Sequence, residues 1–308
     1  AMLIQNQNPA MVAPETLKVL RGLKREDLFL CVHEQFMTET AELADIILPA
    51  TMFLEHDDMY KGGGHTYLQV TRKIIEPYAE CRSNHDVICA LAVRLGADHP
   101  GFTMTPWELI DQSLKASGLP GAEEALKARW IDCAKPADDM NFLNGFGHAD
   151  GRFRFAPDWA ALGPAHAEMP ALPDHMETIE AASPDHPYRM VTAPARRFLN
   201  SSFTETETSR KKEGRPTILI HPADCRNLNL AEGDRVRIGN QRGDVVVHAK
   251  PFDGLQQGVV VVEGIWPNKA FIEGVGINAL TGADPAPPAG GAAFHDTAVW
   301  LRADNGGG

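Results

Sequence analysis

The sequence after Tyr188 is a succession of short segments rich in β-branched side chains, and this pattern constrains the fold more than any other. Gly, Asp and Asn turns separate the segments, as expected for consecutive strands. A single short helix, capped near His221–Asp224 and stopped by Gly233, interrupts them. Many short strands with one small helix predict a compact barrel. The expected strands are YRMVTA, PTILIHP, DRVRIGN, DVVVHAKP, GVVVVEGIW and HDTAVWL.

The region from Met2 to about Gly96 has a different pattern, in which apolar strands alternate with helices. Such alternation predicts a parallel sheet covered by helices on both faces. Pro14 marks a helix start, because its missing N–H is not needed in the first turn. The expected strands are Met2–Gln7, Asp27–Gln35 and Asp45–Ala50, and the expected helices are Thr38–Ala44, with Thr38 as N-cap, and Ser83–Gly96.

Residues 99–187 carry weaker signals. The stretch from Thr105 to Gly118 predicts a helix, and GRFRFAPDW at 151–159 predicts a small strand. The Pro-, Ala- and acid-rich run from Gly163 to Pro187 is typical of a linker. We therefore expect two domains: an α/β domain with its linker over 1–187, and a β domain over 188–308.

The composition excludes several classes of protein. A net charge of −12 argues against a general nucleic-acid binder or a binder of anionic membranes, since both need a basic face. No apolar run approaches the roughly 20 residues that span a bilayer. The five cysteines contain no C-x-x-C pair, and no H-E-x-x-H spacing occurs, so we expect no metal ligands. No nucleophile–base pair stands out, so no catalytic residue is assigned.

Three polar stretches are candidates for binding a ligand. His33-Glu34-Gln35 ends a predicted strand, where parallel sheets bind ligands, although a solvated strand end fits equally well. Thr192–Ser202 combines Arg, Asn and Ser in one loop, which suits a diphosphate and a heterocycle, with an ordinary exposed loop as the alternative. The long loop 274–301 contains Asn278, whose amide offers both a donor and an acceptor.

Two glycine motifs have simpler explanations. Arg242-Gly243-Asp244 predicts a hairpin turn, with Gly243 at positive φ, rather than an adhesion signal. Gly62–Gly64 precedes a strand-like segment rather than a helix, which argues against a phosphate-binding loop. A close backbone approach to a neighbour or a ligand is the better explanation for these glycines.

Together these stretches resemble the C-terminal part of molybdopterin oxidoreductases of the dimethyl sulfoxide reductase family. The segments NQNPAMVAP, HEQFMTETAELADIILPATMFLEHDD and AECRSNHDVICALAVRLG resemble parts of that family's third domain. HPADCRNLNLAEGDRVRIGNQRGDVVVHAK and INALTGADPAPPAGGAAFHD resemble its molybdopterin-dinucleotide-binding domain. The resemblance implies a partial Rossmann-like parallel sheet with helices, followed by a double-psi β-barrel.

The resemblance also implies a function. The chain would hold molybdopterin guanine dinucleotide with molybdenum, and the cofactor would do the redox chemistry. The implied contacts to the cofactor are Asn6, Asn8, His33, Glu34, His56, Asn84, Thr192, Arg196, Arg197, Asn200, Ser201, Ser202, Trp266, Asn278 and His295.

In the family, an iron–sulfur domain and a domain bearing the molybdenum ligand come earlier in the chain. The resemblance therefore implies partners: missing N-terminal domains or a separate catalytic subunit, and an electron-transfer subunit. The isolated chain is expected to be inactive, with the iron–sulfur cluster only in the missing part. The alternative is a separate, non-catalytic nucleotide-binding or partner-binding subunit of a redox complex. A cytoplasmic location is the default expectation, and a periplasmic one stays open.

Overall fold

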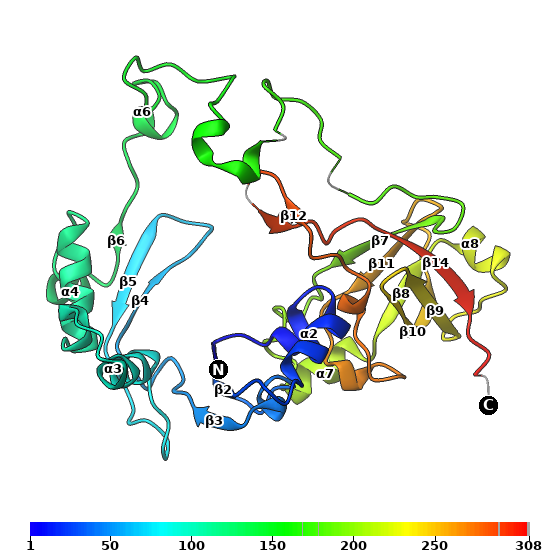
Figure 1. Cartoon of the computed structure of the whole chain (residues 1–308), viewed down its shortest axis with the longest axis horizontal. Helices are drawn as coiled ribbons and strands as arrows, with labels where there is room; N and C mark the ends of the chain where they lie inside the picture. The colour runs from blue at the N-terminus through cyan, green and yellow to red at the C-terminus, as the bar shows by residue number, and fades with distance from the viewer. Residues whose placement is uncertain (168, 178, 289, 307–308) are drawn as a thin grey trace.

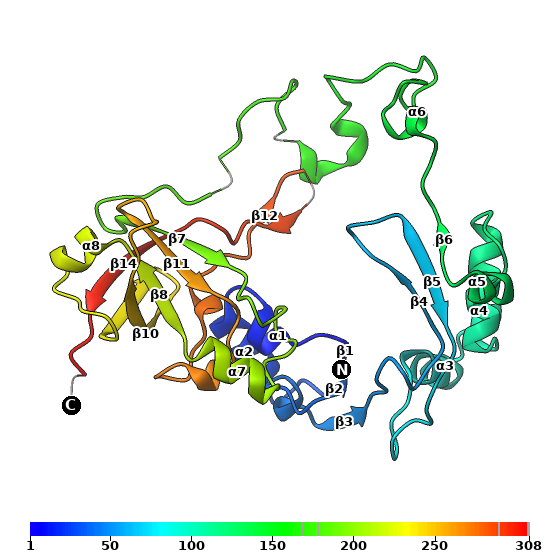
Figure 2. The same ribbon diagram turned by 180° about the vertical axis from the view of Figure 1, so that it is seen from behind.

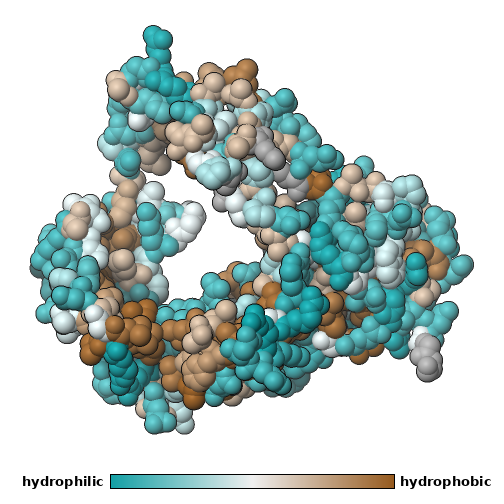
Figure 3. Space-filling view, in the orientation of Figure 1, coloured by the Kyte–Doolittle hydropathy of each residue, from teal (hydrophilic) through white to brown (hydrophobic). Residues whose placement is uncertain are grey.

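The chain follows an open ring in space (Figures 1 and 2). A computed structural model describes residues 1–167, 169–177, 179–288 and 290–306. A barrel forms one side of the ring, a small parallel sheet lies next to it, and a second sheet with helices forms the opposite side. An irregular segment leads back to the barrel, and the space-filling view shows that the centre is open (Figure 3).

The first sheet is parallel, as the sequence predicts, with strand order β1-β2-β3. Its central strand is buried, and Leu30 and Val32 pack with Ala10 and Leu23 of the preceding helices. The helix predicted to start at Pro14 begins at Thr16, with Glu15 as its N-cap in the left-handed region, and a separate short helix starts at Pro9. The elements are β1 (Met2–Gln5), α1 (Pro9–Val12), α2 (Thr16–Leu23), β2 (Leu30–Glu34), η1 (Ala41–Leu43) and β3 (Ile46–Pro49).

The expectation that helices cover both faces of this sheet is wrong for the described residues. Ile46 and Ile47 are consecutive residues of β3, and both are more than 40% exposed. Consecutive strand residues point to opposite faces, so β3 is open on both. The short helices pack on the central strand and on Ile4 of β1, and they leave β3 uncovered.

The second sheet is antiparallel, with order β4-β5-β6, and two helices pack on one of its faces. Two predicted helices are confirmed here with their caps. Ser83 and Thr105 each form a capping box, and Gly96 ends the first helix at φ 69°. The elements are β4 (Asp58–Lys61), β5 (Tyr67–Thr71), α3 (Asn84–Leu95), η2 (Pro100–Phe102), α4 (Pro106–Ala116), α5 (Ala122–Ala128) and β6 (Ile131–Asp132).

Between this sheet and the barrel, the helices of the described residues are all short turns. The strand predicted at 151–159 is wrong: Phe153 packs between Phe146 and Phe155, with ring centroids about 5 Å apart, and no neighbouring strand pairs with this stretch. The turns are α6 (Ala137–Met140), η3 (Ala160–Leu162) and η4 (Pro164–His166).

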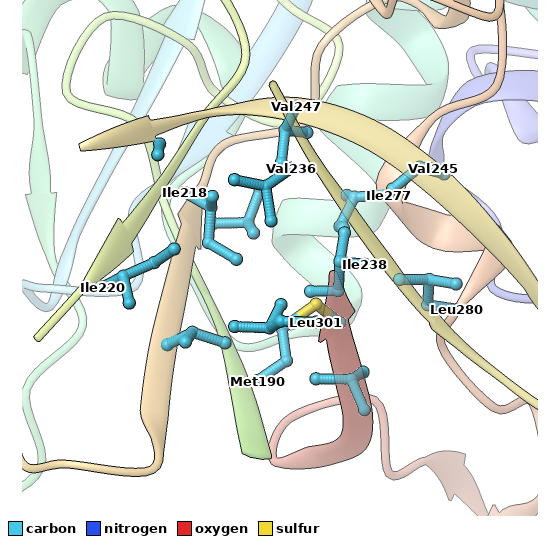
Figure 4. Packing of buried hydrophobic residues seen from close by; sticks show 14 of the residues in the cluster. Met190, Ile218, Ile220, Val236, Ile238, Val245, Val247, Ile277, Leu280 and Leu301 are labelled. Atoms are coloured by element: carbon cyan, nitrogen blue, oxygen red, sulfur yellow. The ribbon is translucent and has the colours of Figure 1, made fainter. Parts of the chain in front are cut away.

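The barrel predicted after Tyr188 is confirmed. Six strands close in the order β10-β8-β11-β7-β14-β9, and their inward side chains form the largest core of the described residues (Figure 4). The β-branched residues of the sequence pattern, such as Ile218, Val236 and Val260, are fully buried in it. The barrel strands are β7 (Tyr188–Ala193), β8 (Thr217–Ile220), β9 (Arg235–Asn240), β10 (Gly243–Pro251), β11 (Val259–Glu263) and β14 (Thr297–Ala303).

Smaller elements connect the barrel strands. The predicted short helix is α8, with His221 as its N-cap, and a second helix, α7, was not predicted. The hairpin at 240–243 is confirmed, but Gly243 does not have positive φ; a Cβ there would lie 3.2 Å from Leu17 Cδ1. The elements are α7 (Glu207–Glu213), α8 (Pro222–Asn227), η5 (Asn268–Ala270), η6 (Ile277–Ala279), β12 (Pro285–Ala286) and β13 (Gly291–Ala292).

Among the residues that the structure describes, no helix has the length and apolar character needed to cross a bilayer.

A cluster of ion pairs on the outside of the barrel connects neighbouring strands and loops. Arg237 on β9 donates to Asp244 on β10, to both carboxylate oxygens of Glu273, and to Asp304 after β14. Its bonds to Glu273 are 2.6 and 2.9 Å long. One guanidinium therefore ties two neighbouring strands to two loops. The Arg237 guanidinium also lowers the pKa of Glu273 through these hydrogen bonds.

Replacing Arg237 with Met should reduce the free energy of unfolding by about 1 kcal/mol at neutral pH, since solvent screens the partly exposed Asp244 and Glu273 carboxylates. Glu273 has a lowered pKa in the folded state, so its stabilisation is complete above the ordinary glutamate pKa of 4.5 and disappears as the pH falls through the folded value. Urea unfolding at pH 7 and about pH 3 measures the difference, with Arg226→Met as an exposed control. An equal loss at both pH values would contradict this account.

Candidate functional site

The carboxyl ends of the parallel strands place several predicted site residues at one edge of the first sheet. Gln5 pairs with His33, and Glu34 pairs with Pro49, so β1, β2 and β3 end side by side. Asn6 follows β1 with φ 58° and is exposed. Glu34 is half-buried, and one of its carboxylate oxygens accepts from the Gln35 N–H. Parallel sheets bind ligands at this kind of edge.

His33 is buried and positions this edge rather than facing solvent. Its Nδ1 lies 2.9 Å from Gln5 Nε2, and its Nε2 lies 3.0 Å from the Arg82 carbonyl oxygen. The Arg82 segment also bridges to Ala50 after β3. These contacts bring Asn84, the first residue of α3, to the same edge.

His56 lies in the loop after β3 and forms part of a chain of polar contacts. Its Nδ1 is 2.8 Å from Thr51 Oγ1, and its Nε2 is 3.6 Å from Asp58 Oδ2. A nearby carboxylate on the Nε2 side favours the tautomer with its proton there. Thr51 in turn accepts a hydrogen bond from the Gln35 side chain through its carbonyl oxygen.

Asn8 is buried beneath this edge. Its Oδ1 accepts from Thr40 Oγ1 at 2.7 Å, and the Thr40 hydroxyl oxygen accepts from the Ala10 N–H. The side chain therefore fixes the start of α1 against the segment after β2, and it is already bonded within the protein.

The second group of predicted residues lies on one rim of the barrel. β7 and β11 are parallel and β14 is antiparallel to β7, so the loops after β7 and β11 and the residues before β14 share one end. Thr192 Oγ1 and His295 Nδ1 meet there at 3.2 Å. The loop after β7 carries Arg196 and Arg197, which are exposed and form no ion pair with any other described residue.

A tight turn and a close approach shape this loop. Leu199 and Ser202 exchange two backbone hydrogen bonds around Asn200, which has φ 50°. Gly264, after β11, has φ 77°, and a Cβ there would lie 2.5 Å from Ala195 Cβ. Glycine is therefore required where the two loops touch. The exposed or half-buried Asn200, Ser201 and Ser202 follow the two arginines around the turn.

Trp266 and Asn278 are in the interior of the protein. The Trp266 ring is buried in the barrel core and meets the Phe198 ring edge-on, with centroids 4.8 Å apart. The Asn278 Nδ2 donates to the carbonyls of Met11 and Val12, and its Oδ1 accepts from Thr281. The amide that the sequence suggested for a heterocycle is thus bonded between the barrel and α1.

Asn268 joins the sheet edge to the barrel rim, and sequence reasoning missed it. Its Nδ2 donates to Ala10 O and to Glu39 of the loop after β2, while its Oδ1 accepts from the Gly276 N–H at 2.8 Å. Asn268 follows Trp266 by two residues, so the segment after β2 lies beside the rim. A single buried Asn has no periodic signal, so no sequence pattern pointed to it.

The edge and the rim offer complementary chemistry to a dinucleotide. The rim supplies two cationic side chains and hydroxyls, which suit a diphosphate. The edge supplies the Glu34 carboxylate and the Asn6 and Asn84 amides, which suit the polar edge of a heterocycle. Asn8, His33, Trp266 and Asn278 are bonded or packed within the protein and position these groups. The residues that remain free fit a phosphate-bearing cofactor.

Comparison with known proteins finds a family match in each half of the chain. The family described as "Molybdopterin oxidoreductase" matches residues 1–94. The family described as "Molydopterin dinucleotide binding domain" matches residues 188–298. The two matches cover the sheet edge and the barrel rim, respectively.

Individual relatives extend the similarity over nearly the whole chain. A probable oxidoreductase, YoaE of Bacillus subtilis, is 34% identical over 98% of this chain and 44% of its own length. A dimethyl sulfoxide/trimethylamine N-oxide reductase of Rhodobacter capsulatus is 28% identical over 84% of this chain and 35% of its own. The solved structure of acetylene hydratase from Pelobacter acetylenicus shares the fold, with a TM-score of 0.78 at 20% identity, over 98% of this chain and 44% of that one. The chain thus spans less than half the length of these relatives.

Replacing Asn268 with Ala should reduce the free energy of unfolding by about 2 kcal/mol. The change leaves the Ala10 carbonyl and the Gly276 N–H without their partner in a buried place. Thermal unfolding measures the loss, and Asn227→Ala, an exposed site at the end of α8, is the matched control. If both variants unfolded at the wild-type temperature, the contacts of Asn268 with Ala10 and Gly276 would not stabilise the protein.

Proposed function

Because the chain belongs to the molybdopterin oxidoreductases of the dimethyl sulfoxide reductase family, we propose that it holds the guanine dinucleotide form of the molybdopterin cofactor between the sheet edge and the barrel rim. The observation that carries the proposal is the contact of Asn268 with Glu39, which sets the acceptor-rich edge beside the unpaired arginines of the rim.

On the rim, Arg196 and Arg197 would hold the diphosphate, with Ser201 and Ser202 as additional hydroxyl donors. Charge-assisted bonds from two guanidinium groups give such a site both affinity and orientation. Thr192 and His295 would contact the cofactor from the neighbouring strands, since their side chains meet at the same rim.

At the sheet edge, Glu34 would accept from the N–H groups of guanine, which adenine does not present in the same pattern. Asn6, His56 and Asn84 surround the same place and would bond the remaining polar atoms. His33 and Asn8 would act beneath them by fixing the strand ends, and Trp266 and Asn278 by fixing the barrel loops.

When bound, the cofactor would supply the redox chemistry at molybdenum, and these residues would bind and orient it. The proposal divides the chain into a part over 1–187 with a Rossmann-like sheet and a part over 188–308 with a double-psi barrel. Turnover would also require an iron–sulfur cluster and a molybdenum ligand from residues outside this chain. The length of the relatives, more than twice that of the chain, supports this requirement.

A separate, non-catalytic subunit is the second candidate function, and the open first sheet favours it. A largely apolar cleft of about 860 Å³ runs along β1 and is lined by Met2, Ile4, Val19, Leu23, Leu28 and Ile88, among others. Exposed apolar surface of this kind is typical of an interaction site. Its partner would be a catalytic or an electron-transfer subunit.

The chain should bind guanosine diphosphate, and the double variant Arg196→Ala/Arg197→Ala should bind it at least about tenfold more weakly, because the diphosphate loses both charged donors. Isothermal titration calorimetry measures the dissociation constants. The double variant Arg152→Ala/Arg154→Ala, with two exposed arginines away from the rim, is the matched control.

Glu34→Gln should bring the affinities for guanosine and adenosine diphosphate closer together, since the carboxylate reads the guanine edge. Equal affinity of the wild-type chain for the two nucleotides would remove the guanine assignment. Equal affinity of the Arg196/Arg197 and Arg152/Arg154 double variants for guanosine diphosphate would contradict the assignment of the diphosphate to the rim.

The purified chain alone should not oxidise reduced methyl viologen with trimethylamine N-oxide as the acceptor, beyond the rate of heat-denatured chain. The expected reason is that the chain supplies no electron relay to the cofactor. Absorbance of the reduced dye follows the reaction. Turnover that scales with the concentration of the native chain would contradict the requirement for residues outside it.

A further inference from the structure

The second sheet has one face that no helix of the described residues covers. Leu68 and Val70 of β5 point to the other face, where they pack with Ile110 and Leu114 of α4. Residues alternate between faces along a strand, so Tyr67, Gln69 and Thr71 point away from the helices. Both ribbon views place this face toward the opening of the ring (Figures 1 and 2).

Strand pairing brings three aromatic rings onto this face. Tyr60 lies opposite Gln69, and Tyr67 lies opposite Asp132, and residues directly opposite share a face. Trp130, just before β6, meets Tyr67 at a centroid distance of 6.5 Å and an interplanar angle of 71°. Tyr60, Tyr67 and Trp130 are 37%, 45% and 54% exposed, so each offers ring surface to solvent. We call Tyr60, Tyr67 and Trp130 the aromatic face.

The polar groups beside the rings are two carboxylates, the Gln69 amide, which donates to the Arg129 carbonyl oxygen, and His65, whose ring centroid lies 5.7 Å from that of Tyr67. Asp58 and Asp132 stand on this face, with Gln69 between them, and its strand positions carry no Lys or Arg. The Thr66 hydroxyl donates to Asp132 at 2.6 Å and lowers the pKa of that carboxyl, which is therefore ionised at neutral pH. Burial and the Asp58 charge raise the pKa of Tyr60, which stays a neutral phenol.

The aromatic face is continuous with the candidate site. Asp58 is both the first residue of β4 and the carboxylate beside His56, and His56 contacts Thr51 at the carboxyl edge of the first sheet. A ligand on the aromatic face would therefore lie next to the residues assigned to the cofactor.

We propose that the aromatic face binds a planar heteroaromatic small molecule that is neutral or positively charged. Exposed rings with open π-faces bind flat rings by stacking and bind cations through their quadrupoles. The two carboxylates exclude anionic rings and favour cationic ones. The face has no aliphatic side chains, unlike the core of a protein–protein interface. A role of the aromatic face in binding the substrate of the enzyme rests on the proposed function. The binding of a planar ring by this face does not.

The chain should bind 1-methylnicotinamide, a planar cation, more tightly than nicotinate, a planar anion of the same size. Tyr67→Ala and Trp130→Ala should each weaken binding of 1-methylnicotinamide at least about threefold, because each removes a stacking partner. Isothermal titration calorimetry measures the affinities. Tyr78→Ala is the matched control, since Tyr78 is 79% exposed but lies outside the aromatic face.

Tyr67 and Trp130 are exposed, so their replacement opens no core cavity, and far-ultraviolet circular dichroism checks the fold of each variant. Equal binding by the Tyr67, Trp130 and Tyr78 variants would overturn the proposal, as would nicotinate binding as tightly as the cation. Guanosine diphosphate titrations of the same variants separate the two proposals. If the wild-type chain binds guanosine diphosphate but not 1-methylnicotinamide, only the aromatic face is contradicted as a binding site. If the wild-type chain binds 1-methylnicotinamide but not guanosine diphosphate, the aromatic face is supported and the cofactor site is contradicted.

Discussion

The arrangement of the molecule depends on two buried amides that join the barrel to the first sheet. Asn268 and Asn278 lie in the same long connection after β11, in the short turns η5 and η6, and both donate to carbonyl groups of α1. Buried amides are costly to leave unpaired, so each contact specifies one relative position of the two units. Through these contacts the two side chains hold the first sheet beside the barrel rim.

Barrel closure determines which loops meet at the rim. The sequence runs from β7 through β8, β9 and β10 before reaching β11, yet β11 pairs in parallel with β7. Parallel pairing sends the loops after both strands to the same end, and Gly264 lets them touch at Ala195. The arginines of the first loop are therefore held beside the segment that carries Asn268. The positions of these rim loops are therefore set by the order of the strands that they connect.

The sequence predicted elements well where local chemistry decides them. The capping boxes at Ser83 and Thr105, the β-branched barrel strands and the parallel order of the first sheet were all predictable from patterns. The strand at 151–159 failed because alternation alone cannot show whether a partner strand exists. The roles of Asn268 and Asn278 depend on contacts across more than 250 residues, which no local pattern carries.

The same limit explains why some of the residues implied by resemblance turned out to be internal. Family resemblance assigns residues to a cofactor, but it does not distinguish a side chain that touches the cofactor from one that positions the loop around it. The structure shows only which side chains are already bonded within the protein: the Asn278 amide donates to two carbonyls, whereas Arg196 and Arg197 are exposed and form no ion pair with another described residue. Affinity should then reside in the rim arginines and geometry in the buried amides. These two kinds of residue respond to different measurements, binding for the first and stability for the second.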